Sequence, residues 1–116
     1  MNIDSSMAVY LANAFSLNML AQSEAVIEVR EVSEEEVRDL LANTEFTSAV
    51  GHQSTAELLS KRLGVNIEFN RIEIKLEPGD TLVVAQLTQR LPEGAVLSEE
   101  ELRQIKIRYF IVRIKE

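Results

Sequence analysis

The strongest constraint on the fold is a central run of strand-forming residues, 81–88, in which residues 82–85 (Leu-Val-Val-Ala) are all apolar. Successive side chains of a strand point to opposite faces of its sheet, so an apolar run without alternation is buried on both faces. Such a strand lies inside a sheet and requires other structure packed above and below it. The chain is therefore expected to build a sheet that is covered on both sides.

Other segments supply the neighbours of this strand. Apolar or alternating patterns predict further strands at 7–12, 25–30, 67–76 and 105–114. The strand at 67–76, strongest over 71–76, is followed by a turn at 78–80. We expect it to pair with 81–88 as an antiparallel hairpin.

Three segments carry helix signals. Ser33 with Glu36, and Ser98 with Glu101, have the spacing of a helix capping box. The third segment is an apolar stripe that ends at Gly64, a residue suited to a helix C-terminus. The predicted fold class is α/β (α+β): a single mixed five-stranded sheet with three helices packed on it, in the order β-β-α-α-β-β-α-β.

Composition excludes several classes of function. The 116 residues predict one domain, 1–116, with 1–6 as a flexible extension. A net charge of −7 disfavours long nucleic acid as a partner, but a small anionic ligand remains compatible with it. No apolar run approaches the roughly 20 residues of a membrane span, and the polar first residues do not resemble a signal peptide. We expect no membrane partner and a cytoplasmic location.

The first candidate for chemistry is His52, the single histidine. Its side chain has an unperturbed pKa of about 6.5 and can transfer protons near neutral pH. Hydroxyl residues surround it in the sequence: Thr47, Ser48, Ser54 and Thr55. They precede or begin the predicted helix that ends at Gly64, whose N-terminus would offer unpaired N–H groups to an anion.

The start of this helix has two alternatives. If it begins at Ser48, His52 lies on the buried stripe and is structural. If it begins at Ser54, with Glu57 completing a capping box, His52 lies in the preceding loop. The spacing alone leaves both a structural and a catalytic histidine open.

The remaining candidates are polar residues in predicted loops or at strand ends, each of which also has a purely structural reading. Asparagine and serine after a strand often serve as turn or cap residues, and an exposed ion pair between Arg90 and Glu93 would contribute little to stability. One His and no Cys are too few for a histidine-cysteine metal site, and no glycine-rich phosphate loop or Gly-x-Ser-x-Gly motif occurs. A Mg²⁺ or Mn²⁺ site made of carboxylates alone would need a spaced set of acidic residues, and none is seen outside the predicted helix caps. We therefore expect no metal and no cofactor. The candidates are Asn13, Ser16, Asn18, Ser48, Arg71, Arg90 and Glu93.

Several of these residues lie in segments that resemble the viral ring nucleases, which are small anti-CRISPR proteins of type III systems. The similar segments are 10–19, 48–56 (Ser-Ala-Val-Gly-His-Gln-Ser-Thr-Ala), 70–71, 79–80 and 90–94 (Arg-Leu-Pro-Glu-Gly). The resemblance covers the chain from Met7 onward. It implies a homodimer that binds cyclic tetra-adenylate and cuts it without metal into linear di-adenylates.

The resemblance also implies roles for individual residues. His52 matches the family's catalytic histidine, and Arg90 and Glu93 match charged loop residues near the ligand. Ligand-contacting positions are matched by Asn13, Ser16, Asn18 and Arg71. The alternative from another class is a non-catalytic sponge or sensor that only binds the cyclic nucleotide, with His52 as a hydrogen-bond donor. A regulatory dimer that acts through protein contacts is a third reading.

Overall fold

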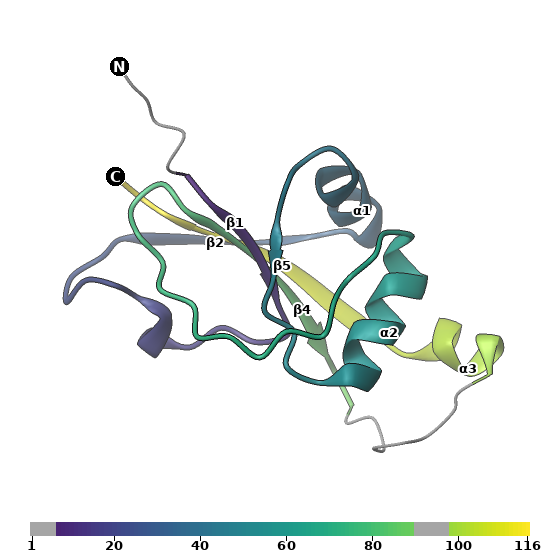
Figure 1. The fold of residues 1–116 in the computed structure, drawn as a ribbon. Coiled ribbons are helices and arrows are strands. Elements are labelled where there is room, and N and C mark those ends of the chain that lie inside the picture. Colours follow the sequence, from purple (N-terminus) through teal and green to yellow (C-terminus); the bar gives the residue numbers. More distant parts are fainter. Residues whose placement is uncertain (1–6, 90–97) are drawn as a thin grey trace.

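The computed structural model describes residues 7–89 and 98–116 (Figure 1). Its single sheet has five strands in the order β2-β5-β4-β1-β3. The strands are β1 (Val9–Ala12), β2 (Ile27–Val32), β3 (Thr47–Ser48), β4 (Thr81–Leu87) and β5 (Ile107–Ile114). The helices are α1 (Glu34–Ala42), α2 (Gln53–Leu63) and α3 (Glu99–Gln104), with a 3-10 helix η1 (Leu17–Met19). One mixed sheet with three helices confirms the predicted fold class.

The apolar run lies at the centre of the sheet, as predicted. β4 pairs in parallel with β1 and antiparallel with β5. The four residues 82–85 are all buried. Because their side chains alternate, Val83 and Ala85 point into one core cluster while Leu82 and Val84 point into another.

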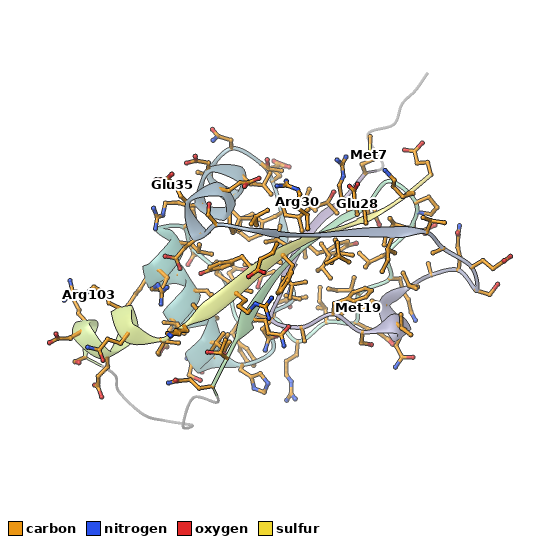
Figure 2. All side chains as sticks on the ribbon, turned by 180° about the vertical axis from the view of Figure 1, so that it is seen from behind. Met7, Met19, Glu28, Arg30, Glu35 and Arg103 are labelled. Atoms are coloured by element: carbon orange, nitrogen blue, oxygen red, sulfur yellow. The ribbon has the colours of Figure 1, made fainter. Side chains whose placement is uncertain are left out.

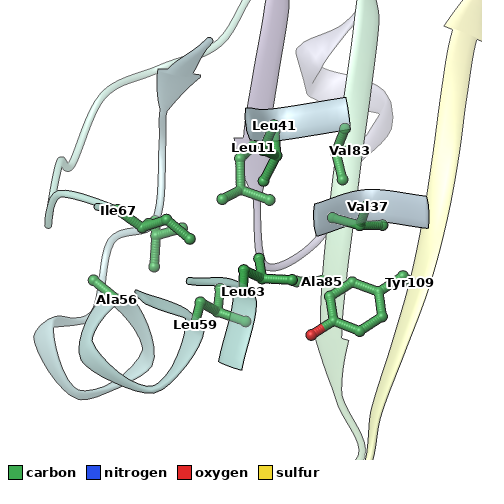
Figure 3. Close-up of a cluster of buried hydrophobic side chains, with 11 residues drawn as sticks. Leu11, Val37, Leu41, Ala56, Leu59, Leu63, Ile67, Val83, Ala85 and Tyr109 are labelled. Carbon is green, nitrogen blue, oxygen red and sulfur yellow. The ribbon is translucent and has the colours of Figure 1, made fainter. Parts of the chain in front are cut away.

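The two faces of the sheet are covered differently, and we name them by their cover. The helical face packs against α1 and α2, whose Val37 and Leu59 meet Tyr109 of β5 in a shared core (Figure 3). The loop face, which carries Val84 and Val112, is covered by the η1 region and by residues 74–76. In Figure 2, Glu35 of α1 and Met19 of η1 accordingly lie on opposite sides of the β2 ribbon.

The strand and hairpin expected from 67–76 are not formed, and this part of the prediction is wrong. Both edges of β4 are already paired, one with β1 and the other with β5. The apolar residues of the segment also serve different faces, because Ile67 packs on the helical face while Ile74 and Leu76 pack on the loop face. The segment therefore passes from one face of the sheet to the other. The fifth strand of the sheet is instead the two-residue strand β3.

The signals at Ser33, Ser98 and Gly64 locate three helix ends correctly. The Ser33 hydroxyl accepts the Glu36 N–H at α1, and Ser98 and Glu101 form a complete capping box at α3. Gly64 ends α2 in the left-handed conformation, at φ 70°. These local bonds satisfy N–H and C=O groups that helix ends leave unpaired.

One charged side chain ties the three helices together. The Arg62 guanidinium of α2 donates to the carbonyls of Leu102 and Ile105, at 3.0 and 2.7 Å, and pairs with Glu34 of α1 at 2.9 Å. The buried Tyr109 hydroxyl donates to the same Glu34 carboxylate, at 2.6 Å. Burial, reinforced by the bond to Glu34, raises the pKa of Tyr109 well above its ordinary value, so Tyr109 remains a donor.

Candidate functional site

The carboxyl ends of three parallel strands meet at one edge of the sheet. β1 lies between β3 and β4 and runs parallel to both. After β3 the chain enters α2 on the helical face, whereas after β1 it continues to η1 on the loop face. Neighbouring strands whose connections leave on opposite faces create a switch point, where ligands of open α/β sheets commonly bind.

His52 lies at this edge as the N-cap residue of α2. Its backbone is extended, at φ −132° and ψ 127°, and its side chain is exposed and makes no capping hydrogen bond. Neither predicted start of the helix is met, because α2 begins at Gln53. The buried-stripe reading of His52 is wrong, since the stripe starts at Thr55 and Ala56.

The start of α2 also has the properties of an anion site. No side chain caps it, and its first turn contains no acidic residue. The other two helices have three glutamates each in that turn. The positive end of the α2 dipole therefore remains available to an external negative charge, beside an imidazole that can carry a proton.

Arg71 is brought to the same place by close packing against glycine. A Cβ added to Gly51 would lie 3.3 Å from Cγ and 3.8 Å from Nε of Arg71. The Arg71 side chain thus runs across the backbone of Gly51, the residue before His52, and Arg71 is exposed. The structure therefore brings the Arg71 side chain, from about twenty residues later in the chain, to the loop that carries His52 and the start of α2.

Ser48 has a structural task in this arrangement. It is buried, its hydroxyl donates to the Glu68 carbonyl at 2.6 Å, and the same oxygen accepts the Val50 N–H at 3.3 Å. Both hydrogen-bonding functions of the hydroxyl are used inside the protein. Ser48 thus holds the loop that leads to His52, and its predicted contact with a ligand stays a prediction.

Three predicted site residues follow β1 in the connection to β2, and they lie in two places. Asn13 follows β1 directly, at the same edge as the β3–α2 loop, and is half-buried. Ser16 caps η1 by accepting the Asn18 N–H at 3.1 Å, and the Asn18 carbonyl accepts from Lys75 at 3.1 Å. Ser16 and Asn18 are both exposed beside the loop face. In the described parts of the chain, neither has a hydrogen bond to His52 or Arg71.

Arg90 and Glu93 lie outside the described residues, so their predicted roles remain predictions. Sequence reasoning assigned no role to Gly51, against which Arg71 packs, or to Asn70, whose side-chain amide donates to the Ser48 carbonyl in the loop before His52. One signal was present in the sequence: Asn70 interrupts an otherwise strand-like segment, and asparagine is depleted in strands.

In 7–89 and 98–116, no cluster of three or more histidine, aspartate and glutamate side chains is arranged to hold a metal ion. No helix within those ranges has the length and apolar character needed to cross a membrane.

Comparisons with known proteins identify relatives, most of them from archaeal viruses. Over 98 residues the chain is 43% identical to "Uncharacterized protein 26" of Sulfolobus islandicus filamentous virus, covering 84% of this chain and 83% of that protein. It is 34% identical over 112 residues to "Uncharacterized protein ORF116" of Acidianus filamentous virus 1, covering 93% and 97%. A bacterial relative, "Uncharacterized protein YddF" of Bacillus subtilis, is 26% identical over 101 residues, covering 85% and 94%.

A solved structure and a family model agree with these relatives. B116 of Sulfolobus turreted icosahedral virus superimposes with a TM-score of 0.78 at 35% identity, over 91% of this chain and 98% of that one. The family model STIV B116-like matches residues 9–110, which include the whole sheet edge described above and most of the chain. The chain belongs to the STIV B116-like family.

Proposed function

We propose that the protein is a metal-independent ring nuclease that binds cyclic tetra-adenylate and cleaves it to linear di-adenylate ending in a 2′,3′-cyclic phosphate. The observation that carries the proposal is the convergence at one sheet edge of exposed His52, the uncapped start of α2 and Arg71 lying across Gly51. Two of these groups suit a phosphate, and the third can move a proton.

The chemistry needs little else from the protein. The ribose 2′-hydroxyl attacks the adjacent phosphorus, its proton passes to water, and the bond from phosphorus to the 5′-oxygen breaks. His52, as imidazolium, gives its proton to the departing 5′-oxygen. Arg71 and the α2 N-terminus would stabilise negative charge as it grows on the phosphoryl oxygens. Glu93 is proposed, from the family resemblance alone, to orient His52, and Arg90 to bind phosphate.

The biological role follows from the family resemblance and from the source of the relatives. Cyclic tetra-adenylate is the second messenger of type III CRISPR immunity, and a virus benefits from its removal. Three matched relatives are viral proteins, from two filamentous viruses and a two-tailed virus. We therefore propose that cleavage switches off type III CRISPR signalling, as an anti-CRISPR activity.

A two-fold symmetric ligand fits a two-fold dimer, which offers two copies of each site residue. The exposed apolar side chains support the loop face as the interface. Val29 lies on that face of β2, while Leu17 and Ile72 lie on segments that border it, with exposed fractions of 54%, 73% and 43%. The helical face, by contrast, is covered by α1 and α2.

Placing a charge on this surface is expected to separate the dimer. Ile72→Arg should cost about 2 kcal/mol of association, because an apolar contact becomes a buried charge. Sedimentation velocity should show monomers at concentrations where the wild type is dimeric. Val26→Arg is the control. Val26 is 69% exposed, and it directly precedes Ile27, whose side chain faces the loop side. Because successive side chains of a strand alternate, Val26 is expected to point away from the loop face. Dimers that persist in Ile72→Arg would exclude this interface.

The central test of the proposal is cleavage in the absence of metal. Labelled cyclic tetra-adenylate incubated with the protein in EDTA should be converted to linear di-adenylate, since the 2′-hydroxyl needs no metal-bound water. Chromatography of the products separates three outcomes. Conversion supports the ring nuclease, retention of intact ligand indicates a sponge or sensor, and absence of binding indicates a protein that acts through other contacts. Turnover that stops in EDTA and returns with Mg²⁺ would contradict the mechanism.

A further inference from the structure

Arg71 belongs to a segment that is held to the β3–α2 loop by a group of hydrogen bonds. The Asn70 N–H donates to the Val50 carbonyl at 2.9 Å, and the Asn70 side-chain amide donates to the Ser48 carbonyl at 2.7 Å. The Ser48 hydroxyl donates in the other direction, to Glu68. These bonds join two chain segments about twenty residues apart, directly before Arg71 in one and before His52 in the other.

Asn70 is the last of these anchors before Arg71. Within residues 7–89 and 98–116, the next backbone hydrogen bond along the segment is that of the Leu76 N–H to the Met19 carbonyl. The backbone of Arg71 therefore depends on the residue before it for its position. Asn70 is half-buried, so its amide bond to Ser48 is partly shielded from competing water.

Gly51 supplies the second element of the arrangement. Its lack of a side chain lets Arg71 cross the loop, with Cγ only 3.3 Å from where a Cβ would stand. Gly51 does not have a positive φ, which among the glycines in the described ranges is found at Gly64 and Gly79. Its backbone would therefore accept alanine, and the close approach of Arg71 remains the reason for glycine here.

We propose that Asn70 and Gly51 are positioning residues, which hold the Arg71 guanidinium beside the α2 N-terminus and His52 so that it meets a phosphate of the ligand. This role rests on the proposed function, since it concerns the same site. Asn70 fixes the backbone that leads into Arg71, and Gly51 leaves room for the Arg71 side chain. Neither residue needs to touch the ligand.

A double-mutant cycle on ligand affinity tests the proposal. Arg71→Ala is expected to weaken binding of cyclic tetra-adenylate by about 10- to 100-fold, as for a lost charged hydrogen bond. Asn70→Ala and Gly51→Ala should each weaken it by about fivefold or more, but only when Arg71 is present. In the Arg71→Ala background both changes should be nearly silent, because the side chain that they position is gone.

Affinity is best measured by titration in protein that carries His52→Ala, so that the ligand stays intact. Kinetics on the catalytic protein add a second readout. In single-turnover experiments, Gly51→Ala should raise the half-saturating concentration more than it lowers the rate at saturation. A purely structural role would instead lower the melting temperature and reduce affinity equally in both backgrounds. Gly51→Ala keeps the test decisive if Asn70→Ala fails to fold, since it removes no hydrogen bond.

The outcomes separate the two levels of the proposal. Effects of Asn70→Ala and Gly51→Ala that disappear without Arg71 would support the positioning role. Effects that persist without Arg71, or affinities that do not change, would overturn it while leaving the nuclease intact. A wild-type protein that binds no cyclic tetra-adenylate would overturn the proposed function, and the positioning role with it.

Discussion

Replacing His52 by alanine is expected to remove most cleavage of cyclic tetra-adenylate while leaving its binding nearly unchanged. The 5′-alkoxide is a poor leaving group, so its protonation matters far more in the transition state than any ground-state contact of the imidazole. Loss of a positioned general acid typically lowers the rate by about 10²- to 10⁴-fold. The expected change is therefore in the single-turnover rate, with a dissociation constant close to that of the wild type.

The fold should tolerate this change, because His52 is exposed and its side chain makes no capping bond to α2. Lys61→Ala, in the last turn of the same helix, is the matched control and should keep wild-type activity. Single-turnover cleavage, a binding titration and a thermal melt on each variant make the comparison complete. A folded His52→Ala protein that still cuts within about tenfold of wild type would exclude His52 as the main acid.

The parts of the fold that sequence predicted well are those set by local chemistry. Burial of 82–85 follows from their apolar side chains alone, and the helix starts at Ser33 and Ser98 follow from hydroxyls that accept nearby N–H groups. Gly64 ends α2 because only glycine adopts positive φ without cost. In each case the feature that decides the structure is the residue itself or a residue a few positions away.

The errors arose where the deciding partner is distant in sequence. Residues 67–76 have a strand-like pattern, but the pairing positions beside β4 are occupied by β1 and β5. Asn70 bonds instead to the β3–α2 loop, about twenty residues earlier. The same long-range contact brings the backbone before Arg71 to the loop before His52, which no pattern within a few residues of Arg71 could indicate.

A second large effect is expected at Arg62, far from the proposed chemistry. Its guanidinium serves two main-chain carbonyls and the Glu34 carboxylate, and only 18% of the side chain is exposed. Removing one partner from such a group leaves polar atoms without hydrogen bonds in a region that water reaches poorly. Arg62→Met keeps the apolar stem while deleting the charge.

We expect Arg62→Met to lower the free energy of unfolding by about 2–4 kcal/mol, somewhat below the loss for a fully buried ion pair. For a domain of this size the melting temperature should fall by about 10 °C. Arg38→Met is the matched control, because Arg38 reaches the same Glu34 at 3.8 Å with a side chain that is 45% exposed. Its loss should stay below about 1 kcal/mol, as for surface ion pairs. Thermal and urea unfolding of both variants, measured side by side, would contradict this account if the two losses were equal.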